Sequence, residues 1–167
     1  MKITKQGNIK APIEVVFNFM TDIELYKEEF RRGSKEQSFK LNYDRKNPFG
    51  VGNRIVFSTD TSTIIITIAK NDSPNYLSMS IEPNKRYLDL FGTIQYDGTL
   101  EKINEKATMY NFIYESNKKP RGLLKFIFMC FFHVSFYFTN KRIKKTYSKQ
   151  FRNEQCKRCP LTVYTYL

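Results

Sequence analysis

The feature that most constrains the fold is a period of two in the apolar residues, which runs through most of residues 37–116. Six segments alternate in this way, and they cover about 38–44, 54–58, 63–69, 76–82, 88–103 and 107–116. Such alternation is typical of strands that bury one face and expose the other to water. Because turn-forming residues rather than helices separate the segments, the sequence predicts an antiparallel meander. A first strand over residues 2–9 gives a sheet of six or seven strands.

Two short helices are predicted directly after the first strand. Pro12 suits the first turn of a helix, and Glu14 lies near the positive end of the helix dipole. Thr21 ends this helix, and the Asp22 side chain is placed to cap a second helix over residues 23–30.

The hydrophobic period changes again after Gly122. Residues 123–138 are almost continuously apolar, and Ile143, Tyr147 and Phe151 then recur at every fourth position. This pattern predicts one long helix over residues 121–154. Residues 155–167 have no clear period, so we expect a single domain over 1–154 followed by a tail. The predicted fold class is α+β.

Residues 9–22, which read IKAPIEVVFNFMTD, carry a resemblance to a known superfamily. They are similar to the opening I-x-A-P-x-E-x-V-[WF]-x-[FL]-x-x-[DN] of START-like proteins, a superfamily also called SRPBCC. Residues 50–54 also resemble the G-x-G-x-R turn of these proteins, and the order of elements extends the likeness over about residues 2–154. The chain departs from the pattern in lacking the tryptophan that often follows the second short helix.

The resemblance implies a helix-grip fold. In this fold two short helices follow strand 1, and a long C-terminal helix lies across the concave face of a curved antiparallel sheet. The superfamily includes polyketide cyclase/dehydrase-like and lipid-transport proteins, which share an apolar cavity between sheet and helix. The implied function is binding of a hydrophobic small molecule or lipid in that cavity.

The apolar faces of the predicted strands and long helix supply candidate ligand-binding residues. These are Phe39, Tyr43, Phe57, Ile66, Met79, Tyr110, Phe112, Tyr114, Phe128 and Phe132. Each of them also fits an ordinary hydrophobic core, so the prediction of a ligand site depends on the whole group and not on any one residue. Tyrosine hydroxyls among them could orient the polar end of a ligand.

Residues suited to catalysis or metal binding are few. His133 is the single histidine, and Cys156 and Cys159 form a C-x-x-C pair without the two further ligands that a zinc site needs. We therefore predict no catalytic residue, metal or cofactor. A cyclase/dehydratase-like enzyme without metal stays open as an alternative, because a single carboxyl group or tyrosine in an apolar pocket can act as an acid or base.

The net charge of +12 is concentrated in the last 50 residues. Residues 118–167 hold 12 lysines and arginines and one acid, Glu154, whereas residues 1–117 hold 16 basic and 15 acidic side chains. A second alternative function is therefore docking of the basic helix on an anionic membrane surface or an acidic partner. The candidate contacts are Lys141, Lys144, Lys145 and Lys149. Nucleic acid is less favoured, since no base-reading motif accompanies the charge.

The location of the protein is predicted from its first residues and its cysteines. The N-terminal residues lack the apolar segment of a secretory signal, and three cysteines do not make a disulfide framework. These features favour the cytoplasm, with peripheral attachment to a membrane as the alternative. A bilayer span over residues 123–138 is not expected, because 16 residues fall short of the roughly 20 that a span needs. The oligomeric state is left open.

Overall fold

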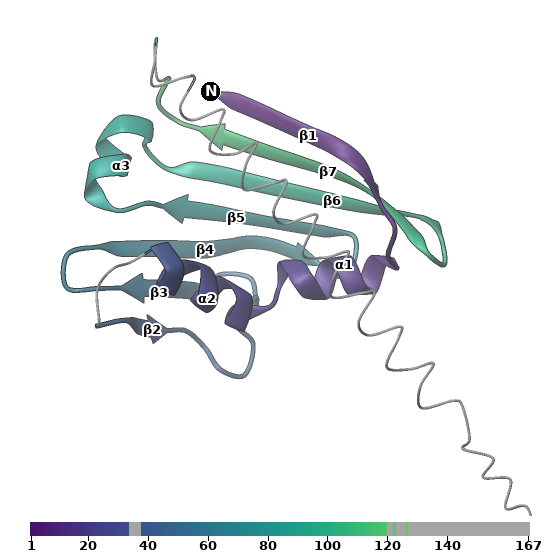
Figure 1. Cartoon of the computed structure of the whole chain (residues 1–167), viewed down its shortest axis with the longest axis horizontal. Coiled ribbons are helices and arrows are strands. Elements are labelled where there is room, and N and C mark those ends of the chain that lie inside the picture. The colour runs from purple at the N-terminus through teal and green to yellow at the C-terminus, as the bar shows by residue number, and fades with distance from the viewer. Residues whose placement is uncertain (34–37, 120–121, 123–125, 127–167) are drawn as a thin grey trace, which may run out of the picture.

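Seven strands form one antiparallel sheet in the computed structural model, which describes residues 1–33, 38–119, 122 and 126 (Figure 1). The strands are β1 (Lys2–Ile9), β2 (Lys40–Asn42), β3 (Arg54–Ser58), β4 (Thr63–Asp72), β5 (Tyr76–Glu82), β6 (Ile94–Asn104) and β7 (Ala107–Ser116). Their order is β1-β7-β6-β5-β4-β3-β2, so every pair except β1 with β7 joins neighbours in sequence. The predicted antiparallel meander is confirmed.

The register of the strands places most of the buried apolar residues of the sheet on one side, which we call the inner face. Met79 lies opposite Tyr96, and Tyr96 lies opposite Tyr114 on the next strand. The buried members of the inner face are Ile9, Ile55, Phe57, Ile66, Ile68, Leu77, Met79, Tyr96, Leu100, Tyr110 and Phe112. Burial of such side chains contributes about 1.5–3 kcal/mol each. The period of two therefore fixes which face the helices must cover.

The opposite side of the sheet, the outer face, is largely polar. On it the Tyr76 hydroxyl donates a hydrogen bond to Asp97 Oδ1 over 2.7 Å. Gln95 Nε2 donates to Ser78 Oγ over 2.8 Å in the same way. These pairs satisfy polar groups that the alternation places away from the core.

Helices α1 (Ile13–Met20) and α2 (Ile23–Gly33) lie on the inner-face side of the sheet (Figure 1). The buried Thr108 Oγ1 donates to the Ala11 carbonyl over 2.8 Å, which ties the start of α1 to β7. The Asp22 carboxylate accepts from the backbone N–H groups of Glu24 and Leu25 over 3.0 and 3.4 Å. Both predicted helices and the Asp22 cap are confirmed.

The expectation of strand over about 88–103, with no helix inside the meander, is wrong at its beginning. A third helix, α3 (Lys85–Phe91), separates β5 from β6. Asn84 caps it by accepting from the Tyr87 N–H over 3.2 Å, and Gly92 ends it with a φ of 69°. Local capping outweighs the weak alternation of these residues, because a capped turn satisfies backbone groups that would otherwise lack partners.

Other predictions fall on residues that the structure does not describe. Apart from Gly122 and Phe126, the predicted helix over 121–154 lies outside the described residues, and so does the tail over 155–167. The domain boundary at residue 154 therefore stays a prediction. Within the described part of the chain, none of the helices has the length and apolar character needed to cross a membrane.

Candidate ligand-binding site

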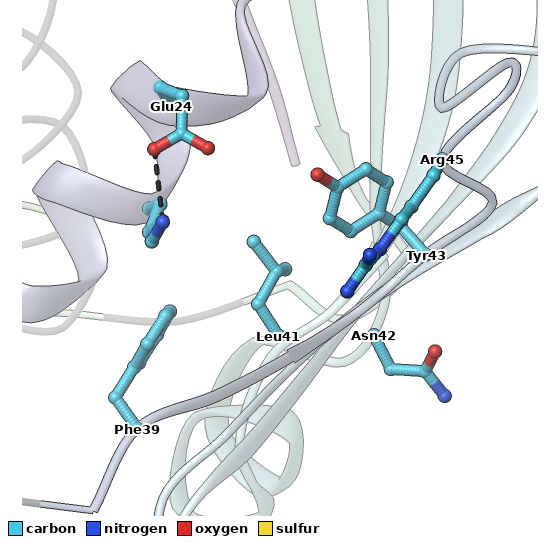
Figure 2. Close-up of a pocket in the computed structure, with 7 residues that line it drawn as sticks. Glu24, Phe39, Leu41, Asn42, Tyr43 and Arg45 are labelled. Atoms are coloured by element: carbon cyan, nitrogen blue, oxygen red, sulfur yellow. Dashed lines mark hydrogen bonds and ion pairs between the residues drawn. The ribbon is translucent and has the colours of Figure 1, made fainter.

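A pocket of about 330 Å³ lies between α2 and the edge strand β2 (Figure 2). We call it the α2–β2 pocket. Its lining residues are Glu24, Lys27, Phe39, Leu41, Asn42, Tyr43 and Arg45. The pocket is formed by one helix and one strand that are joined by a short segment of chain.

The floor of the α2–β2 pocket is apolar because of the alternation around β2. Phe39, Leu41 and Tyr43 are half-buried and point toward α2, whereas Asn42 points away from it (Figure 2). Leu41 lies opposite Phe57 in the sheet, and the rings of Phe39 and Phe57 lie 6.2 Å apart. The floor is therefore continuous with the inner face.

The side of α2 that faces this floor is charged. Lys27 and Glu24 form an ion pair over 3.0 Å, which is the dashed line in Figure 2. α2 is held instead through Tyr26, whose hydroxyl donates to the Met20 carbonyl over 2.9 Å. The Tyr26 ring lies 5.9 Å from the ring of buried Phe49. Charged side chains close poorly onto an apolar floor, because closure would remove them from water.

Arg45 completes the lining at one end of the pocket. It continues the alternation of Phe39, Leu41 and Tyr43 by one further step, and it lines the pocket together with them (Figure 2). The side chain is exposed, and no ion-pair partner of Arg45 occurs among the described residues. The neighbouring Asp44 carboxylate instead accepts from the Lys46 backbone N–H over 2.9 Å.

A second site-like feature of the inner face is an aromatic cluster around Tyr96, which is 6% exposed. Its ring lies 4.9 Å from that of Tyr114 and 5.7 Å from that of Phe112. A Cβ at Gly98 would lie 2.5 Å from the Tyr96 hydroxyl and 3.0 Å from Met20 Cε. The glycine therefore makes room for the phenol beneath α1.

The hydroxyl groups of this cluster are held in their neutral form. Burial raises the pKa of Tyr96 well above the ordinary value for tyrosine, and the neighbouring Tyr114 raises it further. Burial, followed by the nearby Tyr26, also raises the pKa of Tyr114. Within the described part of the chain, the Tyr96 hydroxyl makes no hydrogen bond.

The structure brings only some of the predicted ligand-binding residues to the pocket. Phe39 and Tyr43 line it, and Phe57 lies directly against Phe39. Four other candidates are buried in the core, namely Ile66, Met79, Tyr110 and Phe112. Tyr114 is half-buried and belongs to the aromatic cluster. Phe128, Phe132, Lys141, Lys144, Lys145 and Lys149 lie outside the described residues.

Several lining residues were not predicted. Leu41 and Arg45 share the alternation of Phe39 and Tyr43, so the sequence holds a signal for them. Glu24 and Lys27 lie one helical turn apart, but the sequence does not show that their side of α2 faces β2. Tyr96 alternates with Ile94, Gly98 and Leu100 on β6, and this pattern places it on the inner face.

No metal-binding cluster occurs in the part of the chain that the structure describes. Residues 1–33 and 38–119 contain no group of three or more histidine, cysteine, aspartate or glutamate side chains suited to hold an ion.

Comparison with solved structures identifies the architecture. The chain is similar to the crystal structure of Ara h 8.0201, with 11% identity, 89% of this chain and 98% of that chain covered, and a TM-score of 0.63. It is similar to protein MLL2253 from Mesorhizobium loti, with 14% identity, 87% and 98% covered, and a TM-score of 0.62. The chain has the helix-grip fold.

A further similar structure is a norcoclaurine synthase point mutant from Thalictrum flavum, solved in complex with a transition state analogue. It shares 15% identity, with 72% of this chain and 77% of that chain covered and a TM-score of 0.50. The sequence matches no protein-family model and no curated protein. At such low identities these likenesses show the fold alone.

Proposed function

We propose that the protein binds a mostly apolar small molecule, whose apolar part lies on the floor of the α2–β2 pocket. The observation that carries this proposal is the row of three half-buried side chains, Phe39, Leu41 and Tyr43, that lines the pocket opposite the charged side of α2. The pocket volume of about 330 Å³ falls within the range of about 300–1,000 Å³ that is usual for small-molecule sites. Phe39, Leu41 and Tyr43 are the proposed contacts.

The driving force is the removal of this floor and of the ligand from water. Burial of a CH₂ group contributes about 0.8 kcal/mol, so two further buried carbons should tighten binding by about fifteenfold. Because the floor continues through Leu41 to Phe57, a longer chain could extend along the inner face. The norcoclaurine synthase complex supports the proposal at the level of architecture, since that protein holds a small molecule on a similar fold.

The experiment titrates the full chain with N-phenylnaphthylamine, a neutral apolar probe whose fluorescence rises in apolar surroundings. The variant Leu41→Asn keeps the approximate size of the side chain but makes the floor polar, so it should weaken binding by tenfold or more. Ile113→Asn is the matched control, because Ile113 is a half-buried residue of β7 on the outer face. Equal affinity of both variants, or no binding by the native chain, would refute the proposal.

The other functions stay hypotheses. A cyclase/dehydratase-like activity would need an acid or base in contact with the ligand, and Glu24 is the carboxyl group that lines the pocket. Docking on an anionic membrane surface would depend on the lysines of residues 141–149, which lie outside the described residues. A cytoplasmic location likewise stays a prediction.

A further inference from the structure

The α2–β2 pocket is chemically asymmetric. Its floor is apolar, whereas its charged lining residues are Glu24, Lys27 and Arg45. Lys27 and Glu24 neutralise each other in their ion pair of 3.0 Å. The described lining residues therefore carry a net charge of +1, which Arg45 supplies.

Arg45 is available for a ligand. Asp44, the nearest acid in sequence, accepts from the Lys46 N–H over 2.9 Å and from Asn53 Nδ2 over 3.5 Å. It is thereby held in the turn that follows β2. The Arg45 side chain instead lines the pocket together with Tyr43 and Leu41 (Figure 2). A guanidinium presents two parallel N–H donors, a geometry that matches a carboxylate.

We propose that the ligand is an amphiphile with one acidic group, a medium- or long-chain carboxylate. Its chain lies on Phe39, Leu41 and Tyr43, and its carboxylate pairs with Arg45. One negative charge neutralises the pocket, which favours a carboxylate over a doubly charged phosphate monoester. This inference rests on the proposed function, since it assumes that the apolar floor binds the chain.

The contribution of Arg45 to affinity is modest, because the side chain is exposed and water screens the pair. We expect the native protein to bind the acid about fivefold more tightly than the matching alcohol. Salt should reduce this preference, since the Debye length is about 8 Å at 0.15 M ionic strength. The neutral probe should show no such dependence on salt.

The test displaces N-phenylnaphthylamine from the full chain with decanoate, decanol or decyl phosphate, each below its micellar concentration. Arg45→Gln should remove the preference for decanoate over decanol. Arg45→Lys, which keeps the charge but not the paired donors, should retain part of the preference. Lys46→Gln is the matched control, because it removes the same charge from an exposed neighbour that does not line the pocket.

The outcomes separate the two proposals. Failure of all three compounds to displace the probe, or failure of the probe to bind, contradicts the proposed function itself. Equal binding of decanoate and decanol to the native chain leaves the proposed function standing and refutes the role of Arg45. Loss of the preference in Lys46→Gln as well as in Arg45→Gln also refutes it, since the effect would then be general surface charge. Tighter binding of decyl phosphate than of decanoate would overturn the choice of a carboxylate.

Discussion

Replacement of Tyr96 by phenylalanine removes one hydroxyl group from the aromatic cluster beneath α1 and is expected to stabilise the protein. Tyr96 is 6% exposed, its hydroxyl lies over Gly98, and no hydrogen bond of this hydroxyl occurs among the described residues. Burial of a hydroxyl without a partner costs about 1–3 kcal/mol in mutational data. Tyr96→Phe should recover about 1 kcal/mol of this cost, because the ring and its contacts with Phe112 and Tyr114 remain.

The matched comparison is Tyr26→Phe, which removes a hydroxyl that does have a partner. The Tyr26 hydroxyl donates to the Met20 carbonyl over 2.9 Å and holds α2 against the end of α1. A hydrogen bond of this kind contributes about 0.5–1.5 kcal/mol. The two substitutions are chemically identical, yet they should change the free energy of unfolding in opposite directions.

Thermal denaturation of the full chain, followed by circular dichroism, measures both changes. For a chain of this length, 1 kcal/mol corresponds to a shift in Tm of about 2–4 °C. We therefore expect a rise of about this size for Tyr96→Phe and a similar fall for Tyr26→Phe. If Tyr96→Phe destabilises the protein as much as Tyr26→Phe does, the Tyr96 hydroxyl has a partner and the reasoning is wrong.

Three further predictions concern the same core. The raised pKa values of Tyr96 and Tyr114 mean that the folded chain keeps protons that the unfolded chain releases above about pH 10. The free energy of unfolding should be fully present below that pH and should fall above it, by up to about 1.4 kcal/mol per pH unit for each tyrosine. Urea titrations at several pH values measure this fall, and Tyr96→Phe should make it less steep. Thr108→Val removes the buried hydrogen bond to the Ala11 carbonyl and should lower stability by about 1–2 kcal/mol, whereas an unchanged urea midpoint would contradict that bond. Gly98→Ala should cost about 1–3 kcal/mol through the clash with the Tyr96 hydroxyl, and a double-mutant cycle should show a smaller cost in the Tyr96→Phe background.

The sheet could be predicted from the sequence because its information is local. An alternating segment such as Ile64, Ile66 and Ile68 must present one face to the core, and this condition fixes the register with its neighbours. α3 was missed because its signals are single residues. Asn84 as a cap and Gly92 as an end are visible in the sequence, but they compete with an alternation that continues into β6.

The candidate site was predicted only in part, because a pocket depends on which faces meet. Phe39 and Tyr43 follow from the alternation around β2, and both line the α2–β2 pocket. Lys27 and Glu24 do not follow, since the orientation of α2 is set by Tyr26 and its contact with Phe49. Polar residues at a helix surface are usually solvated, so their position above an apolar floor becomes visible only in the folded chain.

The central claim is that an apolar molecule binds on the floor of the α2–β2 pocket. The most direct measurement is methyl NMR of the full chain, isotope-labelled at leucine and isoleucine, during titration with N-phenylnaphthylamine. The Leu41 methyl signals should shift and saturate at the same probe concentration as the fluorescence, whereas those of Ile65 and Ile113 on the outer face should not move. Saturation of the fluorescence with unmoved Leu41 signals, or shifts confined to Ile65 and Ile113, would contradict the claim.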